Sequence, residues 1–289
     1  MYHLNTRLNA TEEKSKMYET AHFLLPLHKQ TSNMPKYIDT HSHFYDPSFA
    51  QDVAFAVRRA VECGVTRIIL PDTNEDEREK MFELAALFPE HLYPCLGLHP
   101  TELKPDWRAQ LDLVENFSGQ KIHAIGEIGL DFYWEGYDPA VQEEVFRTQL
   151  DLALKLDLPV IVHNREATGN ILRILSDYKG RGLRGVFHAF TGSYETFAQL
   201  QRYGDWYVGI GGVLTFRKAS IAQTVKEIPI DRILLETDSP YLTPAPYRGQ
   251  RNESALIPVI AQKLADIREM NLEKVASHTT ANAEKLFGI

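Results

Sequence analysis

The 289-residue chain carries 31 Lys and Arg against 39 Asp and Glu, a formal net charge of −8. This balance argues against a broadly basic surface that grips a duplex, although an enzyme that holds a nucleic-acid end through metal ions and a few arginines remains compatible with it. Cys63 and Cys95 lie outside any CxxC pair, so neither a disulfide framework nor a thiolate zinc site is expected, and a reducing, cytoplasmic location fits. No apolar run approaches the roughly 20 residues that a membrane-spanning helix requires.

Residues 1–35 precede the first strand pattern and contain one apolar cluster, AHFLLPLH. The cluster is short, is interrupted by Pro26 and follows a stretch in which acids dilute the basic residues, so it is a poor signal peptide. We interpret residues 1–35 as a poorly ordered N-terminal extension with a short helix at 11–20, and Met34 as an alternative start. A single domain is expected over residues 36–289.

From Lys36 onward, short apolar runs alternate with longer amphipathic segments. Eight of these runs are almost continuously apolar, which is typical of parallel strands that are buried on both faces. The eight expected strands cover residues 37–43, 67–71, 93–99, 122–129, 158–163, 185–190, 206–212 and 232–238.

Helical patterns occupy most of the intervals between these runs. The expected helices cover residues 47–64, 74–89, 138–157, 168–179, 193–204, 217–228, 253–270 and 271–287. Asn74 is a candidate N-cap of the second helix. Strand and helix repeated in this way predict a (β/α)8 barrel of the α/β class. A doubly wound sheet is the competing fold, but it usually has fewer strands, and no glycine-rich dinucleotide motif follows the first strand here.

Polar residues at the carboxyl ends of the strands are the candidates for chemistry, because the active site of such a barrel lies there. The run YIDTHSHF places His41 and His43 two residues apart, so both point to the same side of an extended strand. The other expected strand ends carry His99, Glu127, His163, His188 and Asp238. Side chains of these types are costly to bury without partners, so their shared position favours a common site.

Imidazole nitrogens and carboxylate oxygens are ligands of catalytic Zn²⁺, and oxygen-rich sets also suit Mn²⁺ or Mg²⁺. Six ligands are too many for one ion that must keep a position open for water, and they suit two divalent ions that share a carboxylate and a hydroxide. Glu127 is the expected bridge. His41, His43 and Asp238 would complete the coordination of one ion, and His163 and His188 would complete that of the other.

Seven stretches resemble the TatD family of metal-dependent deoxyribonucleases, within the amidohydrolase superfamily. They are IDTHSHF, GLHP, GEIGLDFY, PVIVHNRE, FHAFTGS, LLETDSPYLTP and RGQRNES, and the resemblance as a whole runs over residues 36–289. The resemblance implies a metal-dependent (β/α)8 hydrolase whose metal positions fall on His41, His43, Glu127, His163, His188 and Asp238. It implies phosphodiester hydrolysis, often as a 3′→5′ exonuclease. Ala189 and Ser254 depart from the family's usual Cys and Pro, at positions that are not ligands.

The predicted mechanism assigns two catalytic carboxylates. Glu127 bridges the two ions, and Asp238 accepts a proton from the nucleophilic water and returns it to the leaving oxygen. Single-stranded DNA or a 3′ end is the expected partner. Substrate contacts are expected from His99, Arg165, Arg248 and Asn252, with Arg251 as a further candidate, because arginine suits phosphate. Phe132, Tyr133, Trp134 and Tyr241 are candidates for stacking on bases.

Two other readings fit parts of this pattern. The same two-ion site would serve an amidohydrolase-type enzyme that acts on a small amide, lactone or phosphoester, although a glutamate bridge in place of lysine favours the nuclease-like branch by resemblance. A non-catalytic barrel that serves as a binding scaffold would require an incomplete ligand set, and here the set is complete.

Overall fold

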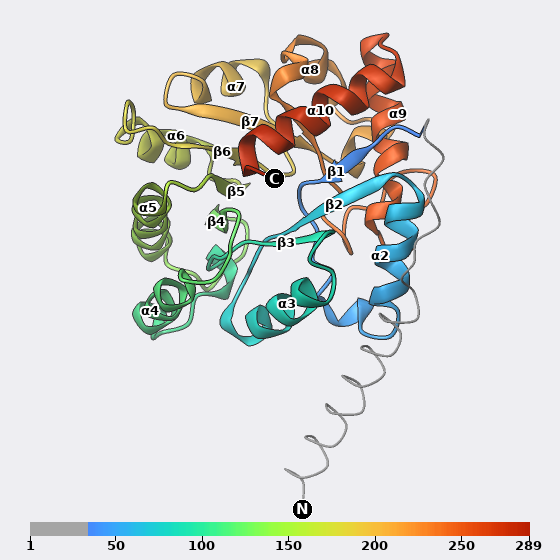
Figure 1. The fold of residues 1–289 in the computed structure, drawn as a ribbon. Coiled ribbons are helices and arrows are strands. Elements are labelled where there is room, and N and C mark those ends of the chain that lie inside the picture. Colours follow the sequence, from blue (N-terminus) through green and yellow to red (C-terminus); the bar gives the residue numbers. More distant parts are fainter. Residues whose placement is uncertain (1–33) are drawn as a thin grey trace, which may run out of the picture.

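Eight parallel strands run through the centre of the molecule, and helices surround them (Figure 1). The computed structural model describes residues 34–289, and the predictions for residues 1–33 lie outside that part. The strands are β1 (Tyr37–Asp39), β2 (Val65–Leu70), β3 (Leu92–Pro94), β4 (Ile125–Asp131), β5 (Val160–Arg165), β6 (Arg184–Phe187), β7 (Asp205–Ile210) and β8 (Ile233–Leu235). Each of the eight predicted apolar runs therefore overlaps a strand.

The strands form two parallel sheets, ordered β1-β2-β3 and β4-β5-β6-β7-β8, which meet at two seams. At one seam, the amide of Gly126 donates to the carbonyl of Leu96 at 2.9 Å. At the other seam, the amide of Thr40 donates to the carbonyl of Leu235 at 3.0 Å. These backbone contacts join the sheets into the predicted (β/α)8 barrel, in which the carboxyl ends of all eight strands face one side.

The outer layer consists of helices that follow the strands in sequence. They are α2 (Val53–Glu62), α3 (Glu75–Leu87), α4 (Trp107–Phe117), α5 (Pro139–Leu156), α6 (Thr168–Ser176), α7 (Tyr194–Leu200), α8 (Ile221–Glu227), α9 (Ile257–Arg268) and α10 (Leu272–Phe287). Short 3-10 helices are η1 (Pro47–Phe49), η2 (Pro100–Glu102), η3 (Gly212–Thr215), η4 (Ile230–Arg232) and η5 (Ser254–Leu256). The predicted cap is present, since the Asn74 side chain accepts from the amides of Asp76 and Glu77.

Helix α4 is absent from the sequence-based prediction. Its fully buried face consists of Trp107, Gln110 and Val114, so a polar residue interrupts the apolar stripe. The Gln110 side chain is buried because it bonds to neighbouring loops, accepting from the amide of Lys104 at 2.9 Å and donating to the carbonyl of Glu102 at 3.1 Å. That partnership depends on the fold and leaves no periodic hydrophobic signal.

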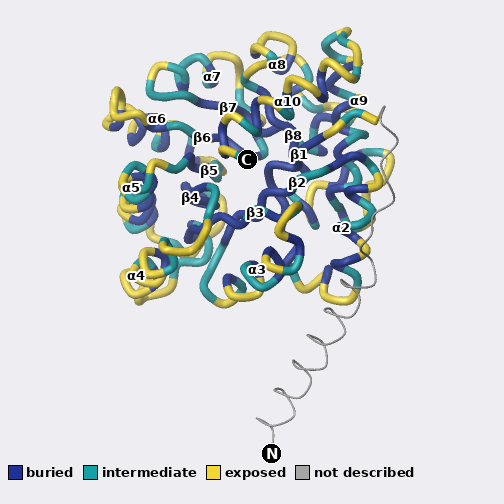
Figure 2. Tube along the Cα trace, viewed as in Figure 1, coloured by how far each residue is buried: buried dark blue, intermediate teal, exposed yellow. Residues whose placement is uncertain are grey.

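Buried residues lie along the central strands and on the helices that cover them (Figure 2). Their apolar side chains form two clusters, one inside the barrel and one between strands and helices. Ile69, Ile161 and Leu234 belong to the interior cluster and are inaccessible to solvent. Leu286 and Phe287 of α10 join the same cluster, so the last helix covers the end of the barrel where the strands begin. The opposite end is left for polar residues. Within residues 34–289, no helix combines the length and apolar character needed to cross a membrane.

A buried ion pair joins helix α3 to the loop after β2. Nε of Arg78 donates to Oδ2 of Asp72 at 2.7 Å, and both side chains are almost fully buried. Asp72 Oδ2 also accepts from the amide of Gly97 at 3.2 Å. The pair therefore ties α3, β2 and the segment after β3 together just below the polar end of the barrel.

We expect Arg78→Met to lower the free energy of unfolding by about 3–5 kcal/mol, because it leaves the Asp72 carboxylate buried without its partner. Urea denaturation followed by circular dichroism measures this loss. Arg58→Met is the matched control, since Arg58 and Glu62 form an exposed pair on α2 that contributes less than about 1 kcal/mol. Equal effects of the two substitutions would contradict a structural role for the buried pair.

Candidate metal centre

The six side chains predicted as metal ligands converge at the carboxyl ends of the strands. Five of them line a cleft of about 790 Å³: His43, Glu127, His163, His188 and Asp238. The sixth, His41, is fully buried and lies against Glu127. Residues that are up to 197 positions apart in the sequence therefore share one site.

Glu127, on β4, stands at the centre of the cluster, and its two carboxylate oxygens face different histidines. Oε2 lies 3.1 Å from Nε2 of His41 and 3.7 Å from Nε2 of His43. Oε1 lies 2.9 Å from Nδ1 of His163 and 2.8 Å from Nε2 of His188. The carboxylate thus presents one oxygen to each histidine pair, which is the arrangement that a bridging ligand needs.

His41 and His43 lie beyond the end of a strand, although the sequence-based prediction placed them inside one. Strand β1 ends at Asp39, and the following residues pair with the segment after β8 instead. The amide of Asp238 donates to the carbonyl of His41 at 2.9 Å, and the amide of His43 donates to the carbonyl of Ser239 at 2.8 Å. This pairing brings Asp238 Oδ1 to 3.7 Å from Nε2 of His41 and 3.6 Å from Nε2 of His43.

Hydrogen bonds on the far side of two rings determine which nitrogen faces the cluster. The Tyr45 hydroxyl donates to the carbonyl of Pro71 at 2.5 Å, so its oxygen accepts from Nδ1 of His43, 2.7 Å away. Nε2 of His163 lies 2.9 Å from Oδ2 of Asp131, which can only accept when it is ionised. Neutral His43 and His163 therefore turn an unprotonated nitrogen toward Glu127, as metal ligation requires.

His99 lies in the same cluster, but it turns its protonated nitrogen toward Glu127. Its Nδ1 accepts from the amide of Thr101 at 3.2 Å, so the proton of the neutral ring is on Nε2. Nε2 lies 3.4 Å from Oε1 of Glu127. His99 thus faces the cleft as a hydrogen-bond donor, which suits the predicted substrate contact better than a place among the metal ligands.

Burial and charge together shift the pKa values of the cluster. Burial on its own would raise the pKa of Glu127, but the imidazoles of His188 and His41 outweigh it and hold this pKa well below its usual range. Burial lowers the pKa of His41 to about 4, so this ring is neutral. Burial also opposes a charge on His188, yet the Glu127 carboxylate raises its pKa to about 10. Glu127 therefore needs a positive charge beside it, which a proton or a divalent cation supplies.

The donor set fits divalent cations. No Lys or Arg within residues 34–289 pairs with Glu127 or Asp238, so no side chain with a permanent positive charge offsets these two carboxylates. Nε2 of His41 and Nε2 of His43 lie 3.1 Å apart, a distance at which two lone pairs repel unless something electrophilic lies between them. Histidine and carboxylate without thiolate is the set found in catalytic sites for Zn²⁺ and Mn²⁺.

The structure separates the four predicted substrate contacts. Arg165 is exposed at the edge of the cleft and stacks on Tyr133, with its guanidinium carbon 3.8 Å from the ring centroid. Arg248 is exposed as well, but it lies outside the cleft in a neighbouring groove. His99 lines the cleft, as described above.

Asn252 has a different environment from the one expected of a substrate contact. Its side chain is fully buried, and its amide nitrogen donates to the carbonyls of Thr237 and Tyr241 at 2.8 and 2.5 Å. Both amide protons are therefore used within the protein, and Asn252 fixes the loop that follows β8. Arg251 is also occupied, because its guanidinium binds the Asp52 carboxylate at 2.7 and 2.8 Å.

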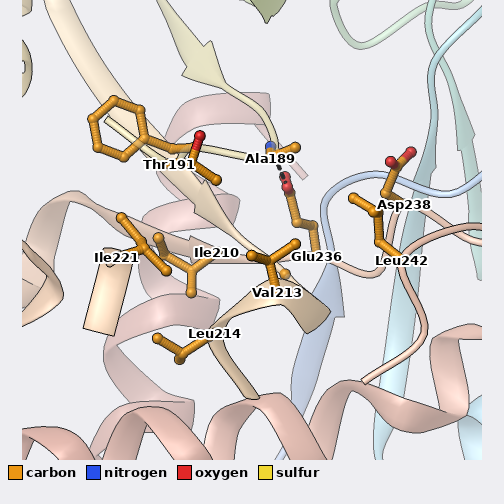
Figure 3. Close-up of a pocket in the computed structure, with 11 residues that line it drawn as sticks. Ala189, Thr191, Ile210, Val213, Leu214, Ile221, Glu236, Asp238 and Leu242 are labelled. Atoms are coloured by element: carbon orange, nitrogen blue, oxygen red, sulfur yellow. Dashed lines mark hydrogen bonds between the residues drawn. The ribbon is translucent and has the colours of Figure 1, made fainter. Parts of the chain in front are cut away.

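Three supporting residues were missed by sequence reasoning: Tyr45, Asp131 and Glu236. Tyr45 and Asp131 lie within YIDTHSHFY and GEIGLDFY, so their closeness to predicted ligands was the available signal. Glu236 is buried and its Oε1 accepts from the amide of Ala189 (Figure 3). Ala189 has a positive φ of 44°, so this bond holds an unfavourable backbone turn directly after His188.

Comparison with known proteins places this site in a family. The model of the family described as TatD related DNase matches residues 38–288. The chain belongs to this family. A Bacillus subtilis (strain 168) relative, the uncharacterized metal-dependent hydrolase YabD, is 36% identical over 253 residues, which cover 87% of this chain and 98% of YabD.

Two further TatD relatives support the assignment. The 3′-5′ ssDNA/RNA exonuclease TatD of Citrobacter rodentium is 34% identical over 249 residues, covering 83% of this chain and 94% of that protein. The crystal structure of YjjV, a TatD homologue from Escherichia coli K12, superposes with a TM-score of 0.81 at 29% identity and covers 88% of this chain and 99% of that one. The chain is thus a metal-dependent hydrolase of the TatD family with a (β/α)8 barrel fold.

We expect Asp131→Asn to weaken metal retention by about 10–100-fold, because an amide at this position no longer holds His163 through a charge-assisted bond. Competition with a chelator, read as bound metal per chain, measures the change. Asp131 Oδ1 accepts hydrogen bonds from the amides of Tyr133 and Trp134, and the side-chain oxygen of asparagine can still accept both. Asp138→Asn, at the exposed cap of α5, is the control. Unchanged retention in Asp131→Asn would show that His163 needs no such support.

Proposed function

We propose that this TatD-family hydrolase is a divalent-metal-dependent deoxyribonuclease that removes nucleotides from the 3′ end of single-stranded DNA. The observation that carries the proposal is the position of Glu127, whose two oxygens face two separate histidine pairs at the floor of an open cleft. The relative named as a 3′-5′ ssDNA/RNA exonuclease supports the choice of substrate class.

Two divalent ions, Zn²⁺, Mn²⁺ or Mg²⁺, are proposed for the site. His41, His43 and Asp238 would hold one, His163 and His188 would hold the other, and Glu127 would contribute one oxygen to each. Divalent ions at such a site lower the pKa of bound water to near neutrality and offset charge on phosphoryl oxygens. Two ions also suit the in-line displacement at a phosphodiester, which develops charge on both the attacking and the leaving oxygen.

The chain's own residues handle the proton and the orientation of substrate. Burial would raise the pKa of Asp238, but the nearby imidazoles of His43, His41 and His188 hold this pKa below its usual range. Asp238 is therefore ionised at neutral pH, and its carboxylate is available to accept a proton from water and to return it to the leaving 3′ oxygen. His99 presents Nε2–H to the cleft and is placed to donate to a phosphate oxygen.

The rim of the cleft offers surfaces that suit a nucleic acid. Trp134 and Tyr241 both line it and leave 54% and 56% of their surfaces exposed. Exposed aromatic faces can stack on bases without reading their sequence. Arg165 adds a guanidinium held against Tyr133 at the same rim. A small amide or lactone would leave these rings in water, so the rim favours a polynucleotide.

A cytoplasmic location remains a prediction from the sequence.

We expect a 5′-labelled single-stranded 20-mer to shorten one nucleotide at a time from its 3′ end, and we expect chelation to abolish this activity. Re-addition of Mg²⁺, Mn²⁺ or Zn²⁺ separately identifies the ion that restores it, with gel electrophoresis as the readout. The control is a 20-mer with a phosphorothioate 3′ terminus, which should resist cleavage. A ladder that begins at internal positions, or hydrolysis of a dipeptide but no oligonucleotide, would refute the proposal.

We expect Asp238→Asn to lower kcat by about 10²–10⁴-fold while KM changes little, because the amide cannot accept the proton. Bound metal is measured alongside turnover. This measurement separates a loss of metal binding at Asp238 from a loss of its ability to accept a proton. Asp46→Asn is the control, since Asp46 lines the same cleft but lies outside the ligand cluster. A variant of Asp238 with near wild-type turnover would reject the assigned role.

A further inference from the structure

A second hollow, which we call the cationic groove, opens beside the catalytic cleft. Its volume is about 480 Å³, and its polar lining comes mainly from Arg217 and Lys218, between η3 and α8, and from Arg248, in the loop after β8. Thr191 and Val213 line both the groove and the cleft. The two hollows are therefore adjacent, with these two residues between them.

The three cations of the groove carry charge that nothing nearby offsets. Arg217, Lys218 and Arg248 are exposed, and none of them has a carboxylate partner within the described part of the chain. Arg251, three residues after Arg248, differs from them because its guanidinium forms an ion pair with Asp52 at 2.7 Å. These three cations make the groove locally positive on a chain whose formal net charge is −8. A cluster of this kind is suited to an anionic ligand.

Arg248 is also held in place. Its guanidinium carbon lies 4.2 Å from the centroid of the Phe216 ring. A guanidinium stacked on an aromatic face loses little further freedom when it binds and keeps the donors on its edge available for phosphate. The groove therefore combines one positioned guanidinium with two mobile cationic side chains.

The opposite wall of the catalytic cleft has the reverse charge. Asp46, Glu77 and Glu102 line the cleft on the side of β1, β2 and β3. A polyanion that enters the cleft is repelled from this wall and attracted toward the groove on the side of β7 and β8. The distribution of charge therefore gives a long substrate one favourable direction.

A small, mostly apolar pocket lies beside both the cleft and the groove and shares Thr191 and Val213 with them. Figure 3 shows its lining, with Asp238 and Leu242 on the side of the cleft and Ile221 on the side of the groove. Val213 and Leu242 offer a phosphate no ion pair, so the nearest exposed cations on this side of the cleft are those of the groove.

We propose that the cationic groove binds the phosphodiester backbone of the polynucleotide strand beyond the scissile bond, through Arg217, Lys218 and Arg248. The inference rests on the proposed nuclease function and makes it more specific. The preferred substrate is a strand long enough to reach from the catalytic cleft into the groove, and a dinucleotide, which fills the cleft alone, gains nothing from these residues.

The double variant Arg217→Ser/Lys218→Ser tests this inference in the metal-loaded, full-length enzyme. We expect KM for a single-stranded 20-mer at 50 mM salt to rise by roughly tenfold or more, with kcat unchanged. Between 50 and 200 mM salt, the wild type should lose about sevenfold more affinity than the variant, since two phosphate contacts are missing from the variant. Hydrolysis of a dinucleotide should be the same in both, which also shows that the variant is folded.

Lys179→Ser/Arg202→Ser is the matched control. Both residues are exposed, and they lie in the loops before β6 and β7, at the other end of the barrel. An equal rise in KM in this control would show a general effect of surface charge and would overturn the assignment of the groove as a binding site. An unchanged KM and salt dependence in Arg217→Ser/Lys218→Ser would overturn it while leaving the nuclease function intact. If the wild type cleaves neither the 20-mer nor the dinucleotide with any of the three metals, the nuclease function fails, and the groove assignment fails with it.

Discussion

The buried charge of Glu127 is the constraint on which the rest of the site depends. An ionised carboxylate that is 3% exposed is costly unless positive charge and hydrogen-bond donors surround it. Five imidazoles from four segments of the chain meet this need, and no Lys or Arg of the described chain does so. An imidazole can lose its proton and bind a metal ion with the same nitrogen, whereas a Lys ammonium or an Arg guanidinium keeps its charge. This site is therefore suited to exchange a proton for a metal ion.

The scaffold fixes the position of this carboxylate through the backbone of Glu127. The amide of Glu127 donates to the carbonyl of Asp72 at 2.8 Å, and the carbonyl of Gly126 accepts from the amide of Asp72 at 2.9 Å. The Asp72 side chain is in turn held by Arg78. A methyl group on Gly126 would lie 2.5 Å from Cβ of Ile161, so glycine is needed where β4 approaches β5. An ion pair far from solvent thus stabilises the loop that aims the central ligand.

The barrel and the convergence of the six candidate ligands could be predicted from the sequence because both leave local signals. Buried parallel strands are continuously apolar, and ligands such as His163 and Asp238 lie at or just beyond strand ends. The features that it did not predict depend on contacts between distant residues. Arg251 pairs with Asp52, 199 positions away, and Asn252 bonds to carbonyls of a loop whose path is set by the fold. In the same way, the backbone of His41 and His43 lies beyond β1 and bonds to Asp238 and Ser239, almost 200 positions away.

The metal ions that we propose would reconcile an acidic protein with an anionic substrate. With both ions bound, the four histidine ligands would be neutral and the two carboxylates would contribute two negative charges, against four positive charges from the ions. The floor of the cleft would then be positive, although the chain as a whole carries −8. Because charges separated by more than about 8–10 Å are largely screened at physiological salt, the local field at the cleft governs how a phosphate is received. The acids on one wall and the cations of the groove on the other then determine the direction in which the strand extends.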